Sequence, residues 1–442
     1  MKIAVIGGGV SGLVSAYLIS KESEKRGIKA SIKLFEKESR CGGTISSTTK
    51  DGFTVESGPN GFLDSKKETL ELIKSAGLGG ELLPSSRESE LRFVYDGKKL
   101  WKVPEKPIEF AFSGLITPLG KARILSEIFI KKSDIPDETV GDFVRRRLGR
   151  EAAEKLIDPM IRGIYAGNLD ELDLDFAFHR MKELERDYGS LFKAMFKLKK
   201  GGPPPGHLTS FRNGMQELID TIEKIGGFEV IKNFEIKEVL KNGDMWRIKA
   251  ENYDEDFDKI VFTLPAYALA KIFKPVSKYA ERISYQPICV VHLGYEEKLL
   301  EKKPQGFGFI TLEEAKLKIL GTIFSSNIFS NRAPEGMVLL SSMVGGAFNK
   351  DVLNMSDDEV INYTVNEVSR IFKSNGKPSF ISFKRHIRAI PNYNLESKNM
   401  KKLIIDEIKK EKGLYLGGNA FFGIGVNDTI KRAYELSSEV FI

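Results

Sequence analysis

The chain has 442 residues, which is too long for one ordinary hydrophobic core and favours two or three domains. Its 41% hydrophobic and 29% charged residues are typical of a soluble globular protein, while two cysteines without a C-x-x-C pair and four scattered histidines argue against a disulfide scaffold or a metal site. The net charge of +7 indicates either a solvated surface or a preference for acidic partners such as anionic lipids, carboxylated ligands or nucleic acid. Of these partners, we do not expect nucleic acid.

The N-terminus resembles a signal peptide only superficially. One positive charge precedes an apolar run from Ile3 to Ile19, but glycines and serines interrupt the run and no small-residue cleavage site follows it. The sequence also lacks an uninterrupted apolar stretch of about eighteen residues. We therefore expect no signal peptide, no transmembrane helix and a cytoplasmic location.

A dinucleotide-binding motif opens the chain. Ile3-Ala4-Val5-Ile6 is typical of a buried parallel strand, Gly7-Gly8-Gly9-Val10-Ser11-Gly12 contains G-x-G-x-x-G, and apolar residues then recur with helical spacing. In this order Gly7 permits a tight turn, Gly9 admits a pyrophosphate against the backbone, and Gly12 allows close packing of helix on strand. A second strand, 31–35, ends at Glu36, whose carboxylate can accept hydrogen bonds from ribose hydroxyls.

Two further glycine-rich turns favour FAD over NAD. Arg40-Cys41-Gly42-Gly43-Thr44 and Glu56-Ser57-Gly58-Pro59-Asn60-Gly61 follow soon after Glu36. Such turns let the backbone run along a larger cofactor, whereas an NAD domain more often continues with its next βαβ unit. Near the C-terminus a short apolar strand, 413–416, runs into a glycine turn at 417–426 and then a helix, which could bring a second helix N-terminus to the flavin.

The middle of the chain is predicted to contain both helices and strands. A helix is predicted over 62–85, a hairpin with a D-G turn over 92–103, helices from about 105 to 200, a linker at 201–206, and strands at 228–236 and 258–264. Thr139-Val-Gly-Asp142 resembles a capping box. Arg145-Arg146-Arg147 follows it and indicates a solvated helix face or, alternatively, a contact with lipid or a carboxylated ligand.

These segments together resemble the FAD-dependent protoporphyrinogen oxidase family of the amine oxidase superfamily over nearly the whole chain. The more specific stretches are Arg92-Phe-Val-Tyr95 with Lys102-Val-Pro104, the run 137–149 continued by Arg162-Gly-Ile-Tyr-Ala-Gly-Asn168, and Gly423-Ile-Gly-Val-Asn-Asp-Thr-Ile430. The sequence departs from the family at Thr44, where some relatives have a larger residue, and at Ala433, which replaces a glycine.

The resemblance implies a site. FAD, bound non-covalently, is expected at positions matching Gly7, Gly8, Gly9, Val10, Ser11, Gly12, Glu36, Lys37, Gly43, Thr44, Gly58, Pro59, Asn60, Gly61, Ile236, Asn419, Ile424, Gly425 and Val426. An arginine matching Arg92 pairs with a substrate propionate, and a glycine matching Gly167 lies beside the substrate. No acid–base dyad is expected, because the flavin performs the difficult step.

The expected fold is α/β. A discontinuous Rossmann-type FAD domain spans 1–88, 206–270 and 401–442, a helical insert spans 89–205, and a mixed α+β substrate domain spans 271–400. The resemblance implies oxidation of protoporphyrinogen IX to protoporphyrin IX in haem biosynthesis, with O2 as acceptor and handover of the product to a ferrochelatase. The alternatives are a coproporphyrinogen III oxidase, an FAD-dependent amine oxidase and a non-catalytic flavin-binding protein.

Residues 107–130 also predict a location. Apolar side chains there are flanked by the basic residues Lys121, Arg123, Lys131 and Lys132, which suits either a core helix or the surface of an anionic membrane. The family resemblance favours peripheral membrane association.

Overall fold

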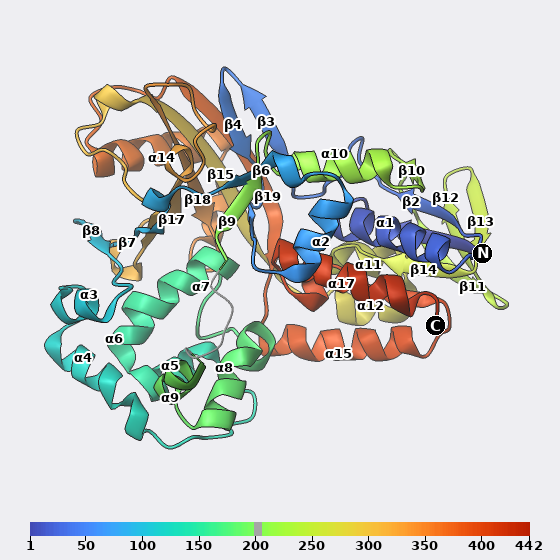
Figure 1. The fold of residues 1–442 in the computed structure, drawn as a ribbon, viewed down its shortest axis with the longest axis horizontal. Helices are drawn as coiled ribbons and strands as arrows, with labels where there is room; N and C mark the ends of the chain where they lie inside the picture. Colours follow the sequence, from blue (N-terminus) through green and yellow to red (C-terminus); the bar gives the residue numbers. More distant parts are fainter. Residues whose placement is uncertain (199–205) are drawn as a thin grey trace.

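The computed structural model describes residues 1–198 and 206–442, and the predicted linker at 201–206 lies outside them except for Gly206. A parallel sheet flanked by helices, a larger antiparallel-rich sheet and a group of helices make up the molecule (Figure 1). Within these residues, none of the helices combines the length and apolar character needed to cross a bilayer.

The parallel sheet is assembled from three separate stretches of the chain. Its order is β10-β2-β1-β14-β20, and every neighbouring pair is parallel. The strands are β1 (Lys2–Ile6), β2 (Ser31–Phe35), β10 (Glu229–Ile231), β14 (Lys259–Phe262) and β20 (Leu414–Leu416). Side chains alternate between its two faces, so that Ile3 and Val5 enter one core while Ala4 and Ile6 enter another.

Helices cover one face of this sheet, and helices with a small sheet cover the other. The first layer comprises α1 (Val10–Lys25), α2 (Lys67–Ser75), α10 (Gln216–Ile225) and α17 (Val426–Glu439). The second comprises α11 (Ala266–Ile272), α12 (Lys274–Ala280), α15 (Leu395–Lys409) and the antiparallel strands β11 (Glu238–Asn242), β12 (Met245–Ala250) and β13 (Tyr253–Phe257). The sheet therefore lies between two buried cores. Its carboxyl edge, where the parallel strands end, is left to face the rest of the molecule.

The larger sheet has the order β19-β15-β18-β17-β16-β7-β8. Its strands are β7 (Arg92–Tyr95), β8 (Leu100–Lys102), β15 (Tyr285–Glu296), β16 (Gly308–Thr311), β17 (Ile319–Phe324), β18 (Met337–Gly345) and β19 (Phe380–Pro391). Helix α14 (Asp357–Phe372) packs on it, while α13 (Ser325–Ile328) connects β17 to β18. Strand β7 pairs parallel with β16 and buries Val94 and Tyr95, and β8 pairs antiparallel with β7. The hairpin therefore extends this sheet, although we assigned 89–205 to a helical insert.

The helical insert follows the hairpin. It contains α3 (Pro107–Phe112), α4 (Pro118–Leu125), α5 (Val140–Leu148), α6 (Arg150–Ala152), α7 (Asp158–Tyr165), α8 (Leu174–Tyr188) and α9 (Leu191–Leu198). Thr139 caps α5 as predicted, since its hydroxyl accepts a hydrogen bond from the Asp142 N–H at 3.1 Å. The remaining strands form two small sheets: β3 (Ser47–Lys50) with β4 (Phe53–Glu56), and β9 (Leu208–Phe211) between β5 (Phe62–Leu63) and β6 (Leu82–Pro84).

The structure contains some of the predicted helices and strands and shortens others. The predicted hairpin and the C-terminal strand–turn–helix are present. The helix predicted over 62–85 is only α2, because β5 and β6 pair with β9 on either side of it. The strand predicted over 228–236 shortens to β10, since residues 233 and 234 instead bond to the backbone of Glu38 and Glu36.

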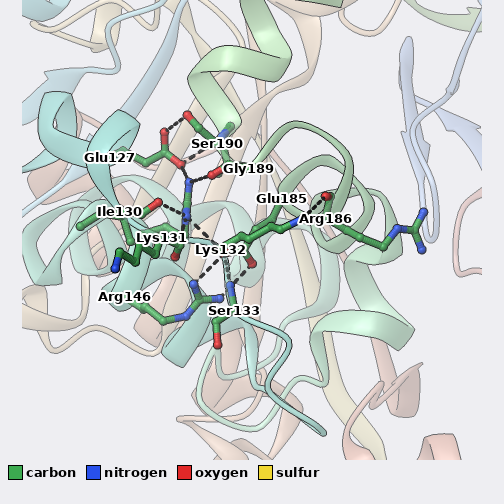
Figure 2. Close-up of polar contacts among 12 residues, drawn as sticks. Glu127, Ile130, Lys131, Lys132, Ser133, Arg146, Glu185, Arg186, Gly189 and Ser190 are labelled. Atoms are coloured by element: carbon green, nitrogen blue, oxygen red, sulfur yellow. Dashed lines mark hydrogen bonds and ion pairs between the residues drawn. The ribbon is translucent and has the colours of Figure 1, made fainter.

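The arginine triplet is not a solvated face. Arg147 is fully buried, and Arg146 bonds in a forked geometry to Glu138 (2.8 Å) and Glu185 (2.7 Å). Figure 2 shows the polar contacts around Glu185 and Glu127 within the insert, with Ser190 donating to Glu127 at 2.6 Å. Only Arg145 faces outward, so the triplet serves packing of the insert and our prediction of a solvated face was wrong for two of its three members.

Candidate flavin site

The first glycine loop lies at the carboxyl edge of the parallel sheet, between β1 and α1. Gly7 has a φ of +108°, and a Cβ on Gly12 would lie 1.8 Å from the carbonyl oxygen of Gly7. A Cβ on Gly9 would meet no protein atom within 4 Å. The tight turn and the close helix packing thus account for Gly7 and Gly12, whereas Gly9 borders open space of the kind that a pyrophosphate needs at a helix N-terminus.

Glu36 follows β2 at the same edge. Its carboxylate accepts hydrogen bonds from the Gly8 N–H at 2.7 Å and the Glu38 N–H at 2.8 Å. The Phe234 N–H bonds to the carbonyl of Glu36 at 2.9 Å, which brings the segment with the buried Ile236 beside this carboxylate. Both carboxylate oxygens keep lone pairs that can accept from ribose hydroxyls, while Lys37 points to solvent and pairs with Glu38.

The second glycine turn packs against the first, and the third packs against the second. A Cβ on Gly43 would lie 3.4 Å from the Cα of Gly9, and one on Gly58 would lie 2.2 Å from the carbonyl oxygen of Thr44. A Cβ on Gly61 would lie 2.5 Å from the carbonyl oxygen of Thr209, with Pro59 and Asn60 between these two glycines. The backbones of consecutive turns therefore approach each other closely, the second against the first and the third against the second.

The C-terminal turn completes this edge. A Cβ on Gly417 would lie 3.1 Å from the hydroxyl oxygen of Ser11. A Cβ on Gly418 would lie 3.2 Å from the carbonyl oxygen of Leu264. Ser11 Oγ is buried without a hydrogen-bond partner in the described residues and packs toward Gly417, so Ser11 can offer its backbone rather than its hydroxyl to a ligand. Val426, at the start of α17, shares a core with α1, and both helices begin at this edge.

The supporting roles of two residues, Arg40 and Asn427, were not predicted from the sequence. Arg40 donates to the carbonyls of Cys41, Gly43 and Ile45 at 2.8–3.0 Å and thereby holds the second turn closed. Asn427 donates to the Leu63 carbonyl at 3.0 Å and ties the start of α17 to β5. Their signal in the sequence is weak, because both bond to backbone carbonyls, and a backbone carbonyl is present at every residue.

The two predicted substrate residues lie apart from each other. Gly167 is buried between α7 and α8, and its neighbours Tyr165 and Leu172 share a cluster with Ile424 of the C-terminal turn. Arg92 lies on β7, where its side chain is 60% exposed, pairs with Glu105 at 2.9 Å and faces the Phe307 ring. Contacts of its neighbours therefore link Gly167 to the C-terminal glycine turn, whereas the contacts of Arg92 are with Glu105 and Phe307.

Aromatic rings line a cavity beside the C-terminal turn. The cavity has a volume of 470 Å³. Tyr165, Phe176 and Tyr393 line it together with Gly423 and Ile424, and charged side chains that include Asp175, Lys401 and Arg432 complete its walls. Burial raises the pKa of the Cys41 thiol, which lies under the first glycine loop, to about 12, so this thiol stays protonated near neutral pH. The local chemistry of the glycine turns is that of helix N-termini and free backbone, which fits a dinucleotide cofactor.

The comparisons identify the family. Residues 10–440 match the family of flavin containing amine oxidoreductases. Spinach chloroplastic protoporphyrinogen oxidase 1 is 30% identical over 99% of this chain and 83% of its own length, and coproporphyrinogen III oxidase of Bacillus subtilis (strain 168) is 28% identical over 97% and 95%. A crystal structure from Exiguobacterium sp. 255-15 superposes with a TM-score of 0.85 at 22% identity, covering 99% of this chain and 98% of the other.

The resemblance inferred from the sequence is therefore confirmed, and so are the α/β fold and FAD as cofactor. The residues at the carboxyl edge fit that cofactor, because Gly9 leaves room for a pyrophosphate, Glu36 can accept from a ribose, and two helix N-termini converge there. This chain belongs to the protoporphyrinogen oxidase family within the flavin-containing amine oxidoreductases and is an FAD-dependent oxidoreductase.

Proposed function

We propose that the protein oxidises protoporphyrinogen IX to protoporphyrin IX. The observation that supports this is similarity over nearly the whole chain to protoporphyrinogen oxidases, together with glycine turns that are free of obstructing side chains. Bound FAD supplies the electron acceptor for repeated hydride removal at its N5 position, with O2 as the proposed final acceptor. The protein's own task is to exclude water, to orient a flat apolar macrocycle and to anchor its carboxylates.

The cofactor contacts that we propose follow the carboxyl edge of the parallel sheet. Gly7 to Gly12 face the pyrophosphate, Glu36 the ribose, and Lys37 and Ile236 the adenine side. Toward the ring system the proposed contacts are Gly43, Thr44, Gly58, Pro59, Asn60, Gly61, Asn419, Ile424, Gly425 and Val426. In this arrangement the N-terminus of α17 can stabilise negative charge on the reduced ring.

The substrate contacts are proposed to lie across from these turns. Gly167, whose neighbours Tyr165 and Leu172 pack with Ile424, is the proposed contact beside the macrocycle, and Arg92 is proposed to bind a propionate through its forked donors. We accordingly assign 1–88, 206–270 and 401–442 to cofactor binding and 271–400 to substrate binding, with the hairpin β7–β8 joined to the latter by its pairing with β16.

Coproporphyrinogen III is the second candidate substrate. The Bacillus subtilis and Staphylococcus aureus coproporphyrinogen III oxidases each match almost the full length of the chain at 28% identity. Anaerobic mixing of the holoenzyme with each porphyrinogen tests both proposals, because a substrate bleaches the oxidised flavin absorbance and a non-substrate does not. Bleaching by a primary amine alone would indicate an amine oxidase, and bleaching by none of them would indicate a non-catalytic flavoprotein.

A membrane contact is proposed for the outer side of the insert. Phe112, Leu119 and Phe129 are 82–84% exposed, on or next to α3, α4 and the turn after α4. Lys106, Lys121, Lys131 and Lys132 lie nearby in the sequence, but Arg123 turns inward to bond the carbonyls of Arg146 and Arg147. Exposed apolar side chains among lysines suit an anionic bilayer, where an apolar porphyrin could also pass to a ferrochelatase.

A further inference from the structure

Tyr393 lies at the junction of β19 and α15, against the C-terminal glycine turn. Its side chain is buried, with 2% of its surface exposed. Its hydroxyl donates a hydrogen bond to the carbonyl oxygen of Asn419 at 2.6 Å and accepts one from the N–H of Gly423 at 2.9 Å. One phenol oxygen thus joins both ends of the short helix within that turn.

This helix has little stability of its own. α16 (Asn419–Phe422) is a single turn between Gly418 and Gly423, whose φ angles are +96° and +107°. A helix of this length leaves its terminal backbone groups unpaired and does not persist without outside contacts. Because Ile424, Gly425 and Val426 follow it directly, the position of α16 sets the position of the backbone that leads into α17.

The ring of Tyr393 is fixed from the other side by the helical insert. It stacks on Phe176 with a centroid separation of 3.9 Å and an interplanar angle of 2°, and it contacts Tyr165 at 5.7 Å. The backbone carbonyl oxygen of Tyr393 also accepts a hydrogen bond from the Asp173 N–H at 3.0 Å. The insert segment that includes Gly167 is therefore attached to the same residue that holds the C-terminal turn.

The phenol is suited to this bridging position. Burial raises the pKa of the Tyr393 hydroxyl far above neutrality, so the hydroxyl keeps the proton that it donates to Asn419. A neutral hydroxyl can donate and accept at the same time, which no other uncharged side chain of this shape does.

We propose that Tyr393 is a positioning residue that fixes the C-terminal glycine turn against the helical insert, and so sets the geometry in which Ile424 to Val426 meet the flavin. The inference rests on the flavin contacts proposed above. It assigns no chemical step to the phenol. Its consequence is that FAD affinity and the flavin's environment depend on a single oxygen atom outside the glycine motifs.

Tyr393→Phe tests this, because it removes that oxygen and keeps the stack on Phe176. The matched control is Tyr363→Phe, whose hydroxyl accepts a hydrogen bond from the Lys318 N–H at 2.8 Å in the other sheet domain. FAD is titrated into flavin-free protein by fluorescence, and the absorption spectrum of each holoprotein is recorded. We expect the Kd of Tyr393→Phe to rise about tenfold, because a buried carbonyl and N–H lose their partner, with altered flavin bands. Tyr363→Phe should keep the wild-type Kd and spectrum.

A wild-type Kd and spectrum in Tyr393→Phe would overturn the inference. If Tyr393→Phe fails to fold while Tyr363→Phe folds, Phe176→Leu provides the second measurement, since it removes the stack but leaves the hydroxyl bonds. A raised Kd in Phe176→Leu supports the inference, and a wild-type Kd there contradicts it. None of these readouts uses a porphyrinogen, so failure of the wild-type protein to oxidise either substrate would reject the proposed function alone.

Discussion

The guanidinium of Arg147 donates a hydrogen bond to the carboxylate of Glu127 inside the helical insert, where both side chains are fully buried. Burial acts to raise the pKa of Glu127, but bonds from Ser190, Leu191 and Arg147 outweigh it and hold the pKa below its usual range. The pair therefore stays charged, and removing one partner leaves an uncompensated charge in the interior.

We predict that Arg147→Leu lowers the free energy of unfolding by about 3–5 kcal/mol, the usual cost of breaking a buried ion pair. Arg145→Leu is the matched control, because Arg145 belongs to the same triplet but pairs with Asp170 at the surface, and its loss should cost at most about 1 kcal/mol. Urea unfolding of the two variants measures both values. Equal losses would show that the buried network does not stabilise the insert.

Gly9 and Gly12 should respond differently to the same substitution. Gly9→Ala meets no protein atom and has a φ of −69°, so the flavin-free protein should keep its stability. Its FAD affinity should fall at least about tenfold, because the methyl group enters the space assigned to the pyrophosphate. Gly12→Ala should destabilise the fold itself, since its methyl group would collide with the Gly7 carbonyl. Thermal unfolding and FAD titration separate the two effects, and full flavin occupancy in Gly9→Ala would contradict the assignment.

These glycines show why the cofactor domain could be predicted from the sequence. A strand, a glycine turn and a helix are adjacent in the chain, so their period and spacing are visible in one short stretch, as at 3–19 and again at 413–439. Arg146 and Tyr393 escaped prediction because their partners, Glu185 and Asn419, are distant in the chain. Local pattern assigns such residues to a solvated face or a loop, and only tertiary packing shows that they are buried.

His292 should make the protein sensitive to acid. Burial lowers the pKa of His292 from 6.5 to about 4. Between these values the unfolded chain binds a proton at His292 that the folded protein does not. The contribution of His292 to stability is therefore constant well above pH 6.5 and is lost as pH falls toward 4. The loss across this window should be about 3 kcal/mol, since one pKa unit corresponds to about 1.4 kcal/mol.

His292→Gln should therefore show a shallower decline, although His386, whose pKa burial also lowers, retains part of it. Urea unfolding at several pH values between 7 and 4.5 (roughly the window set by the histidine pKa values) gives the slope. The exposed His207 provides the control, and His207→Gln should leave the wild-type slope unchanged. An identical slope in His292→Gln would show that another group controls the acid response.

The exposed apolar residues of the insert predict membrane binding. Replacing Phe112, Leu119 and Phe129 by serine should abolish flotation with vesicles that contain anionic lipid, because each side chain contributes about 1.5–3 kcal/mol when buried. These residues are solvent-exposed, so folding and FAD content should not change. A matched triple substitution at the exposed Leu63, Leu70 and Ile225 of the cofactor domain should leave flotation intact. Wild-type protein that does not float would contradict the proposed membrane contact.

Substitutions of Arg92 and of its partner Glu105 should change KM in opposite directions. Its guanidinium pairs with Glu105, so a substrate propionate must compete with that carboxylate. A charge-assisted hydrogen bond contributes roughly 1.5–3 kcal/mol, and the lower end applies here because the side chain is largely exposed and screened. Arg92→Ala should therefore lower kcat/KM about tenfold, mainly through KM. Arg92→Lys should recover only part of this loss, because an ammonium lacks the forked geometry.

Glu105→Gln should act in the opposite sense. Removing its charge frees the Arg92 guanidinium, so KM should fall while kcat and FAD content stay at wild-type values. Steady-state kinetics of these three variants on both porphyrinogens, with Glu90→Gln as an exposed acidic control on the same segment, measures each effect. Coproporphyrinogen III carries more carboxylates than protoporphyrinogen IX, so a larger Arg92→Ala effect on one substrate also indicates which of them this residue selects. If kcat/KM stays at the wild-type value in both Arg92→Ala and Glu105→Gln, Arg92 lies outside the substrate site and its ion pair with Glu105 serves only the surface of the sheet.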